Sequence, residues 1–125
     1  MRLLLDTHVF IWAAIDSKKL GRSAREAILA ADEVYVSAAS IWEIAIKAAL
    51  GKIDGDPHLM VRAIEESGFF SLPVSPAHAA AVAKLPGHHN DPFDRLLVAQ
   101  AITEPLLMLT ADDVLVQYSE LVRLV

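Results

Sequence analysis

The chain has 125 residues, of which 54% are hydrophobic and 22% charged; this balance excludes a disordered chain and predicts one folded domain over residues 1–125. It has no cysteine, which excludes a disulfide scaffold and thiolate metal ligands and agrees with a reducing compartment. Its formal net charge of −5 argues against a passive nucleic-acid binder, which carries a basic face, but allows an anionic substrate that a cation helps to bind.

A membrane or secretory role is not expected from the apolar segments. Asp6 interrupts the first apolar run after three leucines, which argues against the apolar region of a signal peptide. No uncharged apolar run approaches the ~20 residues that span a bilayer. The sequence therefore predicts a soluble, cytoplasmic protein with no membrane partner.

Short apolar runs alternate with helical patterns along the chain. The expected strands are residues 2–5, 34–36, 69–74, 106–110 and 121–125, and Pro73 marks the third as an edge strand. The expected helices are residues 9–15, 23–31, 38–50, 56–68, 76–84 and 92–102, followed by a short helix after Thr110. This alternation predicts an α/β fold with a parallel sheet of about five short strands and helices on both faces.

Capping patterns account for some polar residues at helix starts. Ser23 and Glu26 have the spacing of a capping box. Thr110 and Asp113 have the same spacing at the start of the short helix. Because these two residues already provide the cap, Asp112 between them is predicted to have no capping role.

The segment from Asp91 onward predicts the start of a buried helix. Asp91 is a suitable N-cap, Pro92 fits the first helical position, and Asp94 falls three residues after the cap. The residues that follow are apolar nearly all round, which is typical of a core helix. Asp94 is therefore expected where buried structure meets solvent, although this segment alone favours a capping role for it.

Four acids are expected to meet at one edge of the sheet: Asp6, Glu43, Asp94 and Asp112. Asp6 follows the first strand and Asp112 the fourth, so both lie at carboxyl ends of strands, where open α/β sheets bind ligands. Each acid also has a local explanation, such as a helix cap for Asp6 or an ion pair of Glu43 with Lys47. Four converging carboxylates are harder to explain locally, because like charges repel unless a cation offsets them.

Such a cluster is suited to metal-assisted hydrolysis. Carboxylates without cysteine favour a hard cation, Mg²⁺ or Mn²⁺, which activates water and neutralises charge that develops on a phosphate. Phosphodiester hydrolysis is the expected reaction class. A zinc site is not favoured, because the adjacent His88 and His89 do not share a face in regular structure and no HExxH spacing occurs.

The four acids lie in segments that resemble the acidic motifs of PIN-domain ribonucleases. The matching segments, in the order and spacing of that family, are residues 3–8, 40–44, 89–101 and 109–112. The run DPFDRLLVAQA in the third segment is the most specific part of the match. The resemblance is strongest to the VapC-type toxins of toxin–antitoxin pairs.

This resemblance implies a three-layer α/β/α PIN-like fold and a metal-dependent endoribonuclease toxin. It implies that Asp6, Glu43, Asp94 and Asp112 surround one or two Mg²⁺ or Mn²⁺ ions, with metal-activated water hydrolysing RNA phosphodiester bonds. It also implies a homodimer and a cognate VapB-type antitoxin that covers the active site.

Further residues are candidates for supporting roles around the acids. The resemblance gives Thr7 and Thr110 positions behind the acids and makes Arg95 a candidate for a phosphate or antitoxin contact. Lys47 is the candidate for contact with RNA, because it lies one turn from Glu43 on the same polar stripe. Most other basic side chains are expected to lie on the solvated surface without a specific role.

The two tryptophans have two interpretations. Trp12 and Trp42 could stack on bases, as aromatic side chains do in single-strand binding. Both lie in apolar helical segments, which favours packing in the core or at an interface.

A phospho-receiver-like signalling module is the main alternative, since it also alternates strands with helices and holds Mg²⁺ with carboxylates. It requires an acidic pair after the first strand and a phospho-accepting Asp after the third. Here the first strand ends in the single Asp6, and the third ends in Leu72 and Pro73. A non-catalytic interaction module, in which the acids are caps and an apolar surface binds a partner, is a further alternative that metal binding would exclude.

Overall fold

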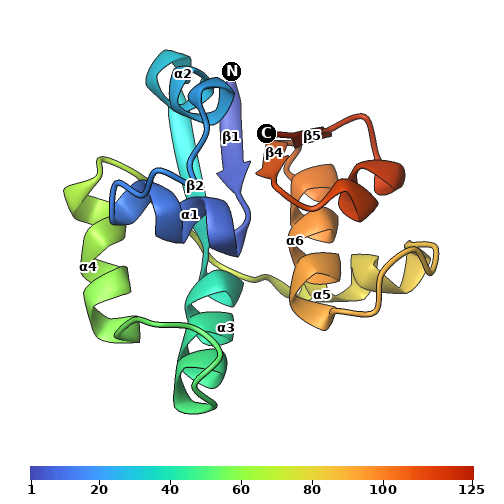
Figure 1. Ribbon diagram of the computed structural model, residues 1–125. Coiled ribbons are helices and arrows are strands. Elements are labelled where there is room, and N and C mark those ends of the chain that lie inside the picture. The colour runs from blue at the N-terminus through green and yellow to red at the C-terminus, as the bar shows by residue number, and fades with distance from the viewer.

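Five strands form one sheet in the computed structural model, which describes all residues from 1 to 125 (Figure 1). The strands are β1 (Arg2–Leu5), β2 (Glu33–Ser37), β3 (Phe70–Leu72), β4 (Leu107–Thr110) and β5 (Val122–Leu124). Their order is β3–β2–β1–β4–β5 and every pair is parallel, which confirms the predicted parallel sheet. The third strand lies at an edge, as predicted, but it is shorter than the expected residues 69–74 and ends at Leu72, because Pro73 cannot donate a backbone hydrogen bond to the sheet.

Helices connect the strands and cover both faces of the sheet. They are α1 (Thr7–Ala14), α2 (Arg22–Ala30), α3 (Ala38–Ala49), α4 (Pro57–Glu66), α5 (Pro76–Ala81) and α6 (Pro92–Thr103), with the short 3-10 helices η1 (Val82–Lys84) and η2 (Asp113–Tyr118). In Figure 1, α1 and α4 lie on one side of the sheet, and α5 and α6 lie on the other. None of these helices combines the length and apolar character that crossing a bilayer requires.

The sheet separates two hydrophobic clusters. Leu3 and Leu5 of β1 belong to a cluster with Phe10 of α1, whereas Leu4 belongs to a second cluster with Leu97 of α6. These five side chains are fully buried. Because successive strand residues point to opposite faces, an uninterrupted run of leucines suits a strand that is covered on both sides. The two clusters produce the three-layer α/β/α arrangement.

The order of the strands reverses at β1. The chain winds from β1 through β2 to β3 at one edge, and β4 and β5 are then added on the other side of β1. The carboxyl ends of β1 and β4 are therefore neighbours at the switch point of the sheet, where open α/β sheets bind ligands. Asp6 follows β1 and Asp112 lies two residues past β4, so the fold brings both to this edge.

Two predicted helix starts differ in the structure. The predicted capping box at Ser23 is wrong, because α2 already begins at Arg22, with Gly21 as an N-cap that makes no side-chain hydrogen bond. Asp112, not Thr110, caps η2. Thr110 is the buried last residue of β4, and its hydroxyl is directed to another acid. Asp112 therefore has the local role that the sequence pattern assigned to its neighbour.

Candidate active site

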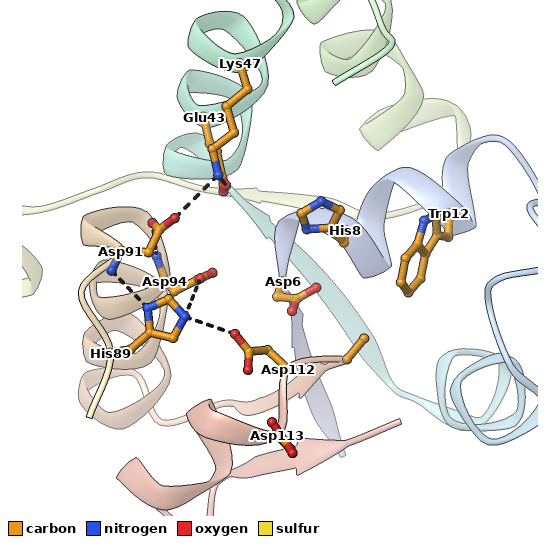
Figure 2. Close-up of a pocket in the computed structure, with 11 residues that line it drawn as sticks. Asp6, His8, Trp12, Glu43, Lys47, His89, Asp91, Asp94, Asp112 and Asp113 are labelled. Atoms are coloured by element: carbon orange, nitrogen blue, oxygen red, sulfur yellow. Dashed lines mark hydrogen bonds and ion pairs between the residues drawn. The ribbon is translucent and has the colours of Figure 1, made fainter. Parts of the chain in front are cut away.

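An open cavity of about 490 Å³ lies at the carboxyl edge of the sheet (Figure 2). Six acids line it: Asp6, Glu43, Asp91, Asp94, Asp112 and Asp113. The other titratable side chains in its lining are Lys47, His8 and His89. The four acids that were expected to converge are all among these six, although they come from four separate segments. Six acids against one lysine make the cavity strongly negative.

Both carboxylate oxygens of Asp6 are held in place. Its Oδ1 accepts a hydrogen bond from the backbone N–H of Val9 at 2.9 Å, as the N-cap of α1. Its Oδ2 accepts a hydrogen bond from the Thr110 hydroxyl at 2.5 Å. Only 5% of Asp6 is exposed, and this burial raises the pKa of Asp6 despite the hydrogen bonds. The structure thus places Thr110 in direct contact with an acid of the site.

Glu43 is buried on α3 between a threonine and a lysine. The Thr7 hydroxyl donates to Glu43 Oε1 at 2.6 Å, and Lys47 Nζ forms a close ion pair with Oε2. Lys47 Nζ also lies 3.4 Å from Asp91 Oδ2. Burial acts to lower the pKa of Lys47, but the hydrogen bond and charge of Glu43, helped by Asp91, outweigh it, and the pKa is raised. Lys47 is therefore a fixed counter-ion of two acids.

Asp94 stands in the first turn of α6, among other carboxylates. Burial raises the pKa of Asp94 to about 7, and the charges of Asp91 and Glu43 contribute to this rise. Asp6 acts in the same direction, whereas His89 opposes it. Asp91 is the N-cap of α6, as predicted, and its Oδ1 accepts a hydrogen bond from the Asp94 N–H at 3.2 Å. The repulsion at Asp94 marks a place where a cation would restore the charge balance.

His89 belongs to the site, although the sequence patterns did not identify it. Its Nε2 lies 3.0 Å from Asp112 Oδ2 and 3.7 Å from Asp94 Oδ2, and the three side chains could together hold a metal ion. Its Nδ1 accepts a hydrogen bond from the Asp91 N–H at 2.9 Å, so the neutral imidazole carries its proton on Nε2, facing the acids. His89 is therefore better suited to donate a hydrogen bond to Asp112 than to bind a metal.

The donor set fits a hard divalent cation. The carboxylate oxygens of Asp6, Glu43, Asp94 and Asp112 are ligands of the kind that Mg²⁺ and Mn²⁺ prefer, and no thiolate is present. Burial is the main cause of the raised pKa of Asp94, and the charges of Asp91, Glu43 and Asp6 raise it further despite the opposing effect of His89. A divalent cation would offset that negative charge.

Arg95 does not line this cavity. Its guanidinium donates hydrogen bonds to the Tyr118 hydroxyl and to backbone carbonyls of the preceding segment, at Val82, Leu85 and Pro86. These bonds tie α6 to the segment that leads into it. A contact of Arg95 with a phosphate would require its guanidinium to leave these partners.

Comparison with known proteins identifies the family. The PIN domain family model matches residues 3–121. The chain is 33% identical over 112 residues to Ribonuclease VapC22 of Mycobacterium tuberculosis, a match that covers 88% of this chain and 86% of that protein. The chain therefore belongs to the PIN domain family, among the VapC ribonucleases.

Solved structures confirm the PIN-like fold. A chain of VapBC2 from Rickettsia felis, bound to a promoter DNA fragment, superposes with a TM-score of 0.71 at 14% identity, covering 99% of this chain and 98% of that chain. A toxin–antitoxin complex from Klebsiella pneumoniae gives a TM-score of 0.67 at 19% identity, covering 97% and 95%. FitAcB from Neisseria gonorrhoeae gives 0.64 at 20% identity, covering 98% and 95%. The phospho-receiver alternative is not favoured, because the family is a different one and β3 ends at the sheet edge in Leu72 and Pro73.

Proposed function

We propose that residues 1–125 form a single PIN domain that acts as a Mg²⁺- or Mn²⁺-dependent endoribonuclease toxin. The observation that carries this proposal is the convergence of Asp6, Glu43, Asp94 and Asp112 on one negative cavity at the switch point of the sheet. The name of the relative VapC22 supports RNA as the substrate class. When bound, the cation would lower the pKa of water and neutralise charge on the phosphate.

Side chains of the cavity are assigned as ligands of that cation, and two threonines orient them. Asp6, Asp94 and Asp112 are assigned as direct ligands through their carboxylate oxygens. Glu43 is assigned as a ligand either directly or through water, because the Lys47 ammonium is already paired with its Oε2 and would compete with a cation there. Thr7 orients Glu43 as Thr110 orients Asp6. Because water is the proposed nucleophile, no side chain of the cavity is assigned that role.

The test of this function compares two adjacent acids. Purified protein is incubated with total cellular RNA in Mg²⁺, in Mn²⁺ or in chelator, and the new 5′ ends are sequenced. Asp112→Asn should abolish metal-dependent cleavage, although Asn can still cap η2. Asp113→Asn is the matched control, because it makes the same charge change at an exposed neighbour in the same cavity. Absence of metal-dependent 5′ ends from protein free of any partner would refute the proposal.

We also propose a homodimer and a VapB-type antitoxin that covers the cavity. The structural relatives include chains from VapBC2 and from a toxin–antitoxin complex, which supports a partner of this kind. Exposed apolar side chains offer surface for such contacts: Ile15, Leu29, Leu50 and Leu59. Light scattering should give the mass of a dimer, and mass spectrometry of the co-expressed complex should find a small second chain. A monomer with no co-purifying chain would contradict both proposals.

A further inference from the structure

A second cavity, of about 330 Å³, adjoins the acidic cavity. Its volume is within the range of about 300–1,000 Å³ that is typical of ligand pockets. The two cavities share His8 and Trp12, which lie one turn apart on α1 with ring centroids 6.0 Å apart. Figure 2 shows His8, with Trp12 beyond it, on the side of Asp6 that is away from Asp94. The two cavities are therefore neighbours that share two aromatic rings, and we refer to the second cavity together with His8 and Trp12 as the groove.

The second cavity has the opposite charge balance. Lys19 and Lys52 line it together with one acid, Asp54, whereas six acids and one lysine line the first cavity. Both lysines are exposed, and neither takes part in a salt bridge. Lys47, by contrast, is paired with two acids. The groove thus offers free ammonium groups next to aromatic rings, the combination with which proteins hold single-stranded nucleic acid.

Trp12 is positioned to act as a stacking platform. It is half-buried and packs against the core cluster that contains Phe10, yet its indole reaches both cavities. A ring that packing already holds loses little conformational entropy when a base stacks on it. Trp42 differs, because it is exposed on α3, packs edge-on against Phe93 at 5.0 Å between centroids, and lines neither cavity. The structure therefore gives Trp12 an open surface in addition to the packing that its sequence predicts.

We propose that this groove binds the nucleotides next to the scissile phosphodiester of unpaired RNA, with one base stacked on Trp12 and flanking phosphates on Lys19 and Lys52. This assignment rests on the proposed nuclease function and adds to it the side chains that hold the nucleotides flanking the cleaved bond. An indole can stack only on a base that is free of its helical neighbours, so the groove selects single-stranded segments and loops. The two lysines draw the phosphate backbone towards acids that would otherwise repel it.

Binding to two short probes tests the stacking contact. The parent protein for this test is the Asp94→Asn variant, which should not cleave RNA because it lacks a proposed metal ligand. It is titrated with fluorescein-labelled hexaadenylate and with an abasic hexamer of the same charge. Trp12→Ala should weaken hexaadenylate binding about 5- to 100-fold and leave abasic binding unchanged, since only stacking is lost. Trp12→Phe should retain most of the affinity, and Trp42→Ala should behave as the parent protein.

The salt dependence of hexaadenylate binding tests the lysines. A double substitution of Lys19→Gln and Lys52→Gln should reduce the slope of log K against log salt by about 1.4, because each phosphate contact to a single strand contributes about 0.7. The matched control replaces Lys18 and Lys84, two exposed lysines that line neither cavity, and should leave the slope unchanged.

Equal binding of the two probes by the parent protein would overturn the groove assignment, as would equal losses from Trp12→Ala and Trp42→Ala. Cleavage of RNA by the wild-type protein is measured separately. Cleavage without base-dependent binding would support the nuclease function and contradict the assignment of the groove. Base-dependent binding that needs Trp12, without any cleavage, would support the groove as a nucleotide-binding site and contradict the nuclease function.

Discussion

Replacing Asp94 by Asn should stabilise the metal-free protein above neutral pH. The pKa of Asp94 is about 7 in the folded protein, against an ordinary value of 3.8. An acid with a raised folded pKa contributes stability below its unfolded pKa and loses it as the pH rises to the folded value. At 1.36 kcal/mol per pKa unit, ionising Asp94 in the fold costs about 4 kcal/mol by pH 8. Because 19% of the side chain remains exposed, a gain of about 1–3 kcal/mol is expected for the Asn variant.

The assay is thermal and urea unfolding in chelator at pH 5 and pH 8. Since ~1 kcal/mol changes Tm by about 3–5 °C in a chain of this size, Asp94→Asn should melt roughly 3–15 °C higher than wild type at pH 8, with a smaller difference at pH 5. Asp113→Asn is the control, because it removes a charge from the same cavity at an exposed position. Added Mn²⁺ should stabilise wild type more than Asp94→Asn. An Asn variant that is less stable than wild type at pH 8 in chelator would refute the view that ionised Asp94 destabilises the fold.

Three further substitutions test the supports of the cavity. Lys47→Gln removes the counter-ion of the buried Glu43, so the metal-free variant should lose about 1–3 kcal/mol in urea unfolding. The same variant should bind Mn²⁺ more tightly in calorimetry, because a positive charge has left the cavity; weaker binding would contradict this. Thr7→Val removes the hydrogen bond to Glu43 Oε1 and should cost about 1–3 kcal/mol, whereas Thr7→Ser should keep it. His89→Ala removes the N–H that faces Asp112 and should lower kcat/KM for RNA cleavage about 10- to 100-fold; an unchanged value would exclude His89 from the site.

The convergence of the acids was predictable because it follows from topology. Asp6 comes directly after a strand and Asp112 two residues after another, and the carboxyl ends of neighbouring parallel strands meet at one edge. Asp94 was predictable for a related reason, since helices that return to a parallel sheet begin at that same edge. Glu43 required an additional argument, namely a polar position on an otherwise apolar helix. These features depend only on hydrophobic periodicity and the alternation of strands and helices.

The side chains that the sequence did not place depend on the shape of loops. His89 reaches Asp112 from the segment before α6, where its position depends on the hydrogen bond that its Nδ1 accepts from the Asp91 N–H. No periodic pattern encodes such a contact, and the adjacent His88 does not line the cavity, in agreement with the expectation that the two histidines do not share a face. The cap of η2 was misassigned because Thr110 stays in β4, where its hydroxyl meets Asp6 across 104 residues of chain. A contact of that separation is visible only in the folded protein.

The local and functional explanations of these acids, which look like alternatives in the sequence, coexist in the structure. Asp6 caps α1 and Asp112 caps η2, and each accepts a backbone N–H through Oδ1. The Oδ2 of Asp6 accepts a hydrogen bond from the buried Thr110, and the Oδ2 of Asp112 meets His89 in the cavity. A cap bond fixes the orientation of the carboxylate, and the partial positive charge of the α1 N-terminus offsets part of the repulsion around Asp6. Asn can form the same cap bond but carries no charge. Loss of cleavage in an Asn variant that keeps the wild-type helix content can therefore be assigned to the missing charge, because the cap that positions the side chain is still present.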